Sequence, residues 1–125
     1  MPNDRENLKN EFKKRLYNFV LKLIEFLDTL PNDPISRRIS DQVFRSGSSI
    51  LSNYVEAQSA TSKKEFVKYF NISLRSTNES KMWLALLRDG KRAKPEDVRW
   101  FLDELTEYAK IFASSILTAK GKRAI

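Results

Sequence analysis

Apolar residues recur at spacings of three and four along most of this chain, which is the pattern of helices that bury one face. The first such segment covers about residues 4–30 and opens on a capping signature, with Asn3 as N-cap and Glu6 in the first turn. Its apolar positions form one continuous stripe: Leu8, Phe12, Leu16, Phe19, Val20, Leu23, Leu27 and Leu30. Pro31 disfavours helical geometry in the residue before it, so the pattern predicts that this helix ends near Leu30.

Three further amphipathic helices are expected at about residues 34–59, 63–89 and 95–120. Asp33 is placed to cap the second helix, and Ser62 to cap the third. The expected core positions are Ile35, Ile39, Val43, Ile50, Tyr54 and Ala57 in the second helix, Phe66, Val67, Phe70, Leu74, Trp83, Leu84 and Leu87 in the third, and Val98, Phe101, Leu102, Leu105, Ala109, Phe112 and Ile116 in the fourth.

Four helices of similar length with joints of a few residues are expected to fold back on one another. The pattern therefore predicts an all-α protein, an up-down-up-down antiparallel four-helix bundle. A chain of 125 residues fits one such domain, over residues 1–125. Gly90 is expected to stop the third helix.

Small and polar residues gather in the middle of the second helix, where Leu and Ile would be usual. Gly47 costs about 1 kcal/mol against Ala inside a helix, which indicates close approach of another backbone. Ser46, Ser49, Asn53 and Glu56 follow at helical spacing and form one polar stripe. Two interpretations stand side by side: a tight helix crossing with hydrogen-bonded polar residues, or a polar site for a ligand or nucleic acid.

An antiparallel turn near residue 61 places the second and third helices in register, so that facing residue numbers add up to about 122. Arg45 then lies level with Glu79, and we predict an ion pair between them, flanked by serines and amides. The expected inter-helix polar network comprises Arg45, Ser46, Ser49, Asn53, Glu56, Ser73, Asn78 and Glu79.

The chain has no Cys and no His. It therefore lacks thiolate chemistry, the usual general acid–base at neutral pH and the commonest metal ligand. We expect no enzyme activity, no metal and no cofactor. An enzyme using Glu56 or Glu79 as base would need a concave pocket and a perturbed carboxylate. No apolar run approaches the ~20 residues that span a bilayer and no signal segment opens the chain, so we expect a cytoplasmic protein without membrane contact.

Lys and Arg total 23 against 16 Asp and Glu, giving a net charge of +7 and a pI near 9.7. Such an excess favours anionic partners, nucleic acid above all, unless it serves only solubility. Without a recognition-helix, zinc-finger or Gly-rich phosphate motif, phosphate contacts should dominate. The candidate contacts fall at the two ends of the bundle: Lys63, Lys64, Lys120, Lys122 and Arg123 at one, and Arg88, Lys91, Arg92 and Lys94 at the other.

An ordered set of motifs covers about fifty residues, from position 38 to position 87. They are Arg-Ser-Gly-Ser-Ser-Ile at 45–50, Asn53-Tyr54, Glu56-Ala57-Gln58, Ser62-Lys63-Lys64-Glu65-Phe66, Asn78-Glu79-Ser80 and Trp83-Leu84-Ala85-Leu86-Leu87. This run resembles the four-helix-bundle proteins encoded in intervening sequences of bacterial 23S rRNA genes, relatives of the accessory variability determinant of diversity-generating retroelements. One departure is Arg75-Ser76, where relatives often carry an acidic residue.

The resemblance implies an antiparallel bundle that assembles into a ring-shaped homo-oligomer, a pentamer in some relatives. It also implies association with nucleic acid in the retroelement branch, while no settled activity accompanies the intervening-sequence branch. We therefore expect a non-enzymatic, basic homo-oligomeric bundle that binds RNA or DNA through phosphates. The alternative is a protein-interaction scaffold that holds a partner protein and binds no nucleic acid.

Overall fold

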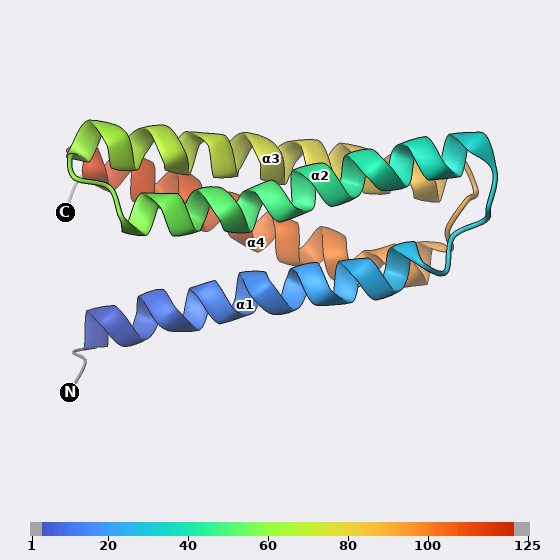
Figure 1. Cartoon of the computed structure of the whole chain (residues 1–125), viewed down its shortest axis with the longest axis horizontal. Helices are drawn as coiled ribbons and strands as arrows, with labels where there is room; N and C mark the ends of the chain where they lie inside the picture. The colour runs from blue at the N-terminus through green and yellow to red at the C-terminus, as the bar shows by residue number, and fades with distance from the viewer. Residues whose placement is uncertain (1–3, 122–125) are drawn as a thin grey trace.

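The computed structural model describes residues 4–121, apart from the side chain of Arg5. This part of the chain forms four helices joined by short turns and contains no strand. The helices are α1 (Asp4–Leu27), α2 (Pro34–Gln58), α3 (Lys63–Asp89) and α4 (Pro95–Ala119). They run alternately up and down in one antiparallel bundle, as the hydrophobic pattern predicts (Figure 1).

Two helix starts are fixed by side-chain caps. The carboxylate of Asp33 accepts from both the backbone N–H and the hydroxyl of Ser36, at 2.9 and 2.8 Å, and Pro34 occupies the first turn of α2. The hydroxyl of Ser62 accepts from the Glu65 N–H at 3.1 Å at the start of α3. The cap expected from Asn3 lies outside the described residues.

Helix α1 ends at Leu27, three residues before the predicted Leu30. The chain tightens here, because the Thr29 N–H donates to the Phe26 carbonyl at 3.0 Å and the Thr29 hydroxyl donates to the same oxygen at 2.6 Å. Gly90 follows α3 with an ordinary φ of −79°, and the left-handed residue is Lys91 at φ 59°. The third helix thus stops at Gly90 as predicted, while the residue after the glycine supplies the left-handed conformation.

The core runs the length of the bundle and is rich in aromatic rings. Phe12 meets the rings of Tyr54, Tyr108 and Phe112 edge-on at 5.1–5.8 Å, so α1, α2 and α4 interlock at one level. Two expected core positions are wrong. Leu8, in the amino-terminal half of α1 that diverges from the other helices, is 71% exposed, and Ile35, the second residue of α2, is 47% exposed.

The helices are not equally close. Among neighbouring helices, α2 and α3 pack most closely, whereas α1 and α4 touch least. The amino-terminal half of α1 diverges from the other three helices (Figure 1). Gly47 lets α1 approach α2, because a Cβ there would lie 2.5 Å from Cδ2 of the buried Leu23. The glycine thus admits a side chain of α1 into the small-residue segment of α2.

Candidate functional site

The polar network between α2 and α3 is centred on an ion pair. Nη2 of Arg45 contacts Oε2 of Glu79, as the helix register predicts. The same carboxylate oxygen accepts from Nε1 of Trp83 at 3.0 Å, and Nη2 of Arg45 also donates to Gln42 at 2.8 Å. The Arg45 side chain is 61% exposed, so water reaches this pair and its stabilising contribution is small.

Serines join the two helices beneath that pair. The hydroxyls of Ser46 and Ser80, both buried, share a hydrogen bond of 2.7 Å. The Ser76 hydroxyl donates to that of Ser49 at 2.9 Å, and the Ser73 hydroxyl donates to the Ile50 carbonyl at 3.1 Å. These short side chains let the two helices lie close, and the tight crossing is the interpretation that this geometry supports.

Three members of the expected network do not connect α2 to α3. Asn53 bonds within its own helix, donating to the Ser49 carbonyl at 2.9 Å. Glu56 and Asn78 are exposed, and neither side chain forms a hydrogen bond or ion pair with another described residue. Helix α2 crosses α3 at an angle instead of running parallel to it. One part of the polar stripe of α2 therefore faces α3, and the other part faces solvent.

A second polar cluster, which the sequence analysis missed, connects α1 to α4. Arg15 donates to both carboxylate oxygens of Glu104, at 2.9 and 2.7 Å, and the Tyr108 hydroxyl donates to Oε1 at 2.9 Å. The hydrogen bond from Arg15 lowers the pKa of Glu104, while burial raises the pKa of Tyr108. Arg15 stands next to the apolar stripe of α1, and this spacing was the available signal.

The bundle end that holds the α2–α3 turn is lined with free cations. Lys63 and Lys64 are exposed at the start of α3, and Lys120 is exposed just after α4. None of the three forms an ion pair with another residue of the described chain. Lys122 and Arg123, expected at the same end, lie outside the described residues. We call the end of the bundle that carries Lys63, Lys64 and Lys120 the lysine end.

The opposite end is neutralised in part. Arg88 pairs with its neighbour Asp89 at 2.9 Å, and Arg92 lies 4.0 Å from Asp33 while donating to the Gly90 carbonyl at 3.0 Å. Lys91 and Lys94 are exposed. The structure therefore divides the nominated cations into a free set at the lysine end and a partly paired set at the other.

The outer face of α3 extends the lysine end. Lys64, Lys68 and Arg75 are exposed and stand at helical spacings that place them on one face. They span about 16 Å at about 1.5 Å per residue. Lys68 and Arg75 were not among the predicted contacts, although their spacing from Lys64 is visible in the sequence.

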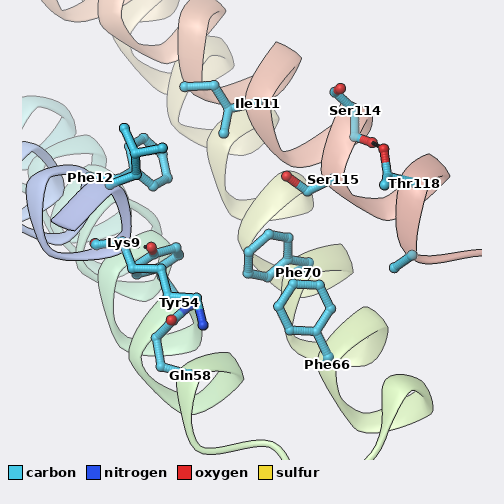
Figure 2. Close-up of a pocket in the computed structure, with 12 residues that line it drawn as sticks. Lys9, Phe12, Tyr54, Gln58, Phe66, Phe70, Ile111, Ser114, Ser115 and Thr118 are labelled. Atoms are coloured by element: carbon cyan, nitrogen blue, oxygen red, sulfur yellow. Dashed lines mark hydrogen bonds between the residues drawn. The ribbon is translucent and has the colours of Figure 1, made fainter. Parts of the chain in front are cut away.

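A groove opens at the lysine end, between the diverging α1 and α4 (Figure 2). Its volume is about 690 Å³. Its lining comes from all four helices: Leu8, Lys9 and Phe12, then Tyr54 and Gln58, then Phe66 and Phe70, and finally Ile111, Ser114, Ser115, Thr118 and Ala119. We call this the end groove. It joins aromatic walls to hydroxyl and amide groups, and none of its lining residues in the described part of the chain carries a carboxylate.

Two further properties of the described residues bear on function. In residues 4–121, no cluster of acidic side chains is arranged to hold a metal ion. Over the same residues, no helix combines the length and apolar character that would let it cross a bilayer.

Comparison with known proteins identifies the family. The model of a family described as 23S rRNA-intervening sequence protein matches residues 9–114. A crystal structure of a protein with unknown function from the S23 ribosomal protein family, from Bacteroides thetaiotaomicron, is similar with a TM-score of 0.77 and 31% sequence identity. The alignment covers 83% of this chain and 96% of that one. No match was found among curated proteins. Since the family match spans nearly the whole bundle, and the packing of α2 on α3 lies within it, the chain belongs to the 23S rRNA-intervening sequence proteins.

Proposed function

We propose that this protein is a non-enzymatic nucleic-acid-binding bundle, and that it binds phosphates through the lysine end and the outer face of α3. The observation that carries the proposal is that five exposed cations without ion-pair partners lie together at this end and on this face: Lys63, Lys64, Lys68, Arg75 and Lys120. A protein that binds phosphates with such side chains releases counterions, which provides most of the affinity.

The distribution of charge among the helices supports this assignment. Helix α3 has six basic residues against three acidic ones, whereas α4 has two against five. On α3, Glu79 is engaged by Arg45 and Trp83, and Asp89 by Arg88. The remaining carboxylate, Glu65, lies at the start of the helix, where its negative charge is offset by the partial positive charge of the helix N-terminus. A polyanion therefore meets its most favourable potential along α3 and its least favourable along α4.

Base recognition does not follow from these contacts. Lysines bind phosphate as point charges and carry no sequence information. The proposal therefore implies similar affinity for RNA and DNA and little preference among sequences.

Charge reversal tests the proposal with a matched control. The variant Lys63→Glu/Lys64→Glu/Lys68→Glu should lose at least about tenfold in affinity for a fluorescein-labelled oligonucleotide at moderate salt. The variant Lys91→Glu/Lys94→Glu/Lys110→Glu has the same change in net charge at sites outside the lysine end and the outer face of α3, and it should lose much less. Equal losses would show that only net charge matters, and unchanged affinity in the first variant would overturn the proposal.

A second candidate function, a protein-interaction scaffold, is favoured by a different surface. Tyr17, Leu21 and Ile24 follow one face of α1, and Phe44 of α2 lies beside Ile24 along a shallow groove; each of the four is at least 41% exposed. We propose that another protein surface covers these side chains, and self-assembly is the simplest case. The mass of the wild-type protein in solution tests this, with Leu21→Glu/Phe44→Glu expected to lower it. A monomeric wild type would contradict self-assembly.

A further inference from the structure

We infer that the end groove receives an unstacked base of a single-stranded nucleic acid whose phosphates lie on the lysine end. This inference rests on the proposed function and adds to it a preference for single strands over duplex. Proteins that bind single strands combine a positively charged path for the backbone with aromatic side chains on which bases stack.

The walls of the groove are aromatic and remain open. Phe12 of α1 and Phe66 of α3 are half-buried, while Tyr54 and Phe70, which also line the groove, are buried in the core (Figure 2). Phe66 packs on Phe70 with ring centroids 4.2 Å apart, which holds its ring in place. A volume of about 690 Å³ is within the range of pockets that hold small organic ligands. The groove thus presents fixed aromatic surface to solvent.

Polar groups suited to the edge of a base surround these rings. The Thr118 hydroxyl donates to the Ser114 carbonyl at 3.0 Å. The side-chain amide of Gln58 and the hydroxyl of Ser115 bond to no other described residue and so retain their donors and acceptors. An acyl chain would leave these groups unmatched, whereas a nucleobase has both ring faces to stack and an edge to hydrogen-bond.

The groove is continuous with the phosphate-binding side chains. Lys9 lines it directly, and Lys120 follows its last lining residue, Ala119. Lys63, Phe66 and Phe70 are spaced to share one face of α3, so a cation stands one turn from the aromatic wall. A strand whose phosphate rests near Lys63 therefore has a base within reach of the groove. A base paired in a duplex cannot enter.

A groove of similar volume elsewhere on the bundle shows the opposite chemistry. It lies along α1, α2 and the joint between them, measures about 680 Å³, and is lined by Asp28 and Asp41 as well as Arg37. Carboxylates on its wall repel a phosphate backbone, and it has one aromatic lining residue, Phe44. Aromatic walls without carboxylates thus coincide with free lysines at the end groove.

Filling the groove tests the inference without removing a cation. Ser115→Phe places a ring in the groove, and Leu117→Phe adds a ring at an exposed position on the same helix outside the lining. Phe66→Leu, which removes a wall but keeps an apolar side chain, is the second variant. Affinities for a fluorescein-labelled oligouridylate and for an RNA duplex of the same length are measured for each, with helicity and melting temperature as checks on folding.

The expected result is a loss of about tenfold in oligouridylate affinity for Ser115→Phe and Phe66→Leu, with duplex affinity and the Leu117→Phe control unchanged. Unchanged oligouridylate affinity in Ser115→Phe, together with loss in the lysine variant, would overturn the groove inference and leave the proposed function standing. If the wild type bound neither nucleic acid, both would fail. Dodecanoate that displaces a naphthalenesulfonate dye from the groove, where oligouridylate does not, would assign the groove to an acyl chain and overturn the inference.

Discussion

Arg15 of α1 binds both carboxylate oxygens of Glu104 of α4, at 2.9 and 2.7 Å, across the neighbouring pair of helices that touches least. The Tyr108 hydroxyl donates to the same carboxylate at 2.9 Å, and the Arg15 guanidinium lies 5.3 Å from the Tyr108 ring. This cluster stands where α1 and α4 begin to diverge toward the end groove. We infer that it holds the two walls of the groove at a fixed separation.

Glu104 should make stability depend on pH. Because the pKa of Glu104 is lowered in the folded protein, its contribution is complete above the ordinary pKa of about 4.3 and is lost as pH falls through the lower folded value. Glu104→Gln should cost about 1 kcal/mol at neutral pH, a modest value because Arg15 is 39% exposed. It should also flatten the loss of stability on acidification. Urea unfolding from about pH 3 to about pH 8 measures both effects, with Asp103→Asn as the control. An unaltered pH profile in Glu104→Gln would contradict this account.

Tyr54 should make the stability of the protein depend on pH at alkaline values. Burial raises its pKa to about 12, and its hydroxyl donates to the Lys9 carbonyl at 3.1 Å. Since folding keeps the proton on the phenol, the contribution of Tyr54 is complete below about pH 10 and declines as pH rises toward the folded pKa. Tyr54→Phe should therefore weaken the fall in melting temperature above about pH 10, relative to the exposed control Tyr17→Phe. The same alkaline fall in both variants would exclude this role.

Gly47 is expected to resist replacement despite its poor helix propensity. Gly47→Ala gains about 1 kcal/mol of propensity, but its Cβ would lie 2.5 Å from Cδ2 of the buried Leu23. Overpacking of this kind costs about 1–3 kcal/mol, so the net change should be destabilising. In a Leu23→Val background, which lacks the clashing atom, the same substitution should become neutral or stabilising. Chemical denaturation of the four proteins measures the coupling, and identical effects in both backgrounds would rule out the contact.

The hydroxyl pair of Ser46 and Ser80 should show strong coupling. Ser46→Ala removes one partner and leaves the buried Ser80 hydroxyl with a lost bond, at a cost of about 1–3 kcal/mol. Ser46→Ala/Ser80→Ala removes both hydroxyls and should cost little more than either single change. A double-mutant cycle by urea denaturation gives the coupling energy. Additive single costs would mean that the two hydroxyls act independently.

The sequence was enough to predict the architecture because each level of pattern agreed. Helical periodicity, caps at Asp33 and Ser62, and short joints permit one topology, and that topology places Arg45 beside Glu79. The register was predictable to within a turn: a sum of about 122 places Ser49 opposite Ser73, and Ser49 meets Ser76 one turn away. Leu8 was misassigned because periodicity reports a helix face without showing where that helix diverges from its neighbours, as α1 does at the end groove.

Features that depend on how helices diverge were not predictable. The end groove exists because α1 and α4 separate toward the lysine end, and no local pattern encodes the angle between two helices distant in sequence. Pairing among charges was equally hidden: Arg88 and Arg92 resembled Lys63 and Lys64 in the sequence, but only the two arginines found acidic partners. Composition indicated a basic protein, and the structure was needed to show which cations remain free.

The salt dependence of single-strand binding tests the central claim most directly. Each phosphate contact to a single strand contributes about −0.7 to the slope of log K against log salt. If Lys63, Lys64 and Lys68 bind phosphates, the variant Lys63→Glu/Lys64→Glu/Lys68→Glu should have a slope shallower than that of the wild type by about 2. The control Lys91→Glu/Lys94→Glu/Lys110→Glu should keep nearly the wild-type slope. Equal slopes in the wild type and the first variant, or no salt-dependent binding in the wild type, would contradict the account.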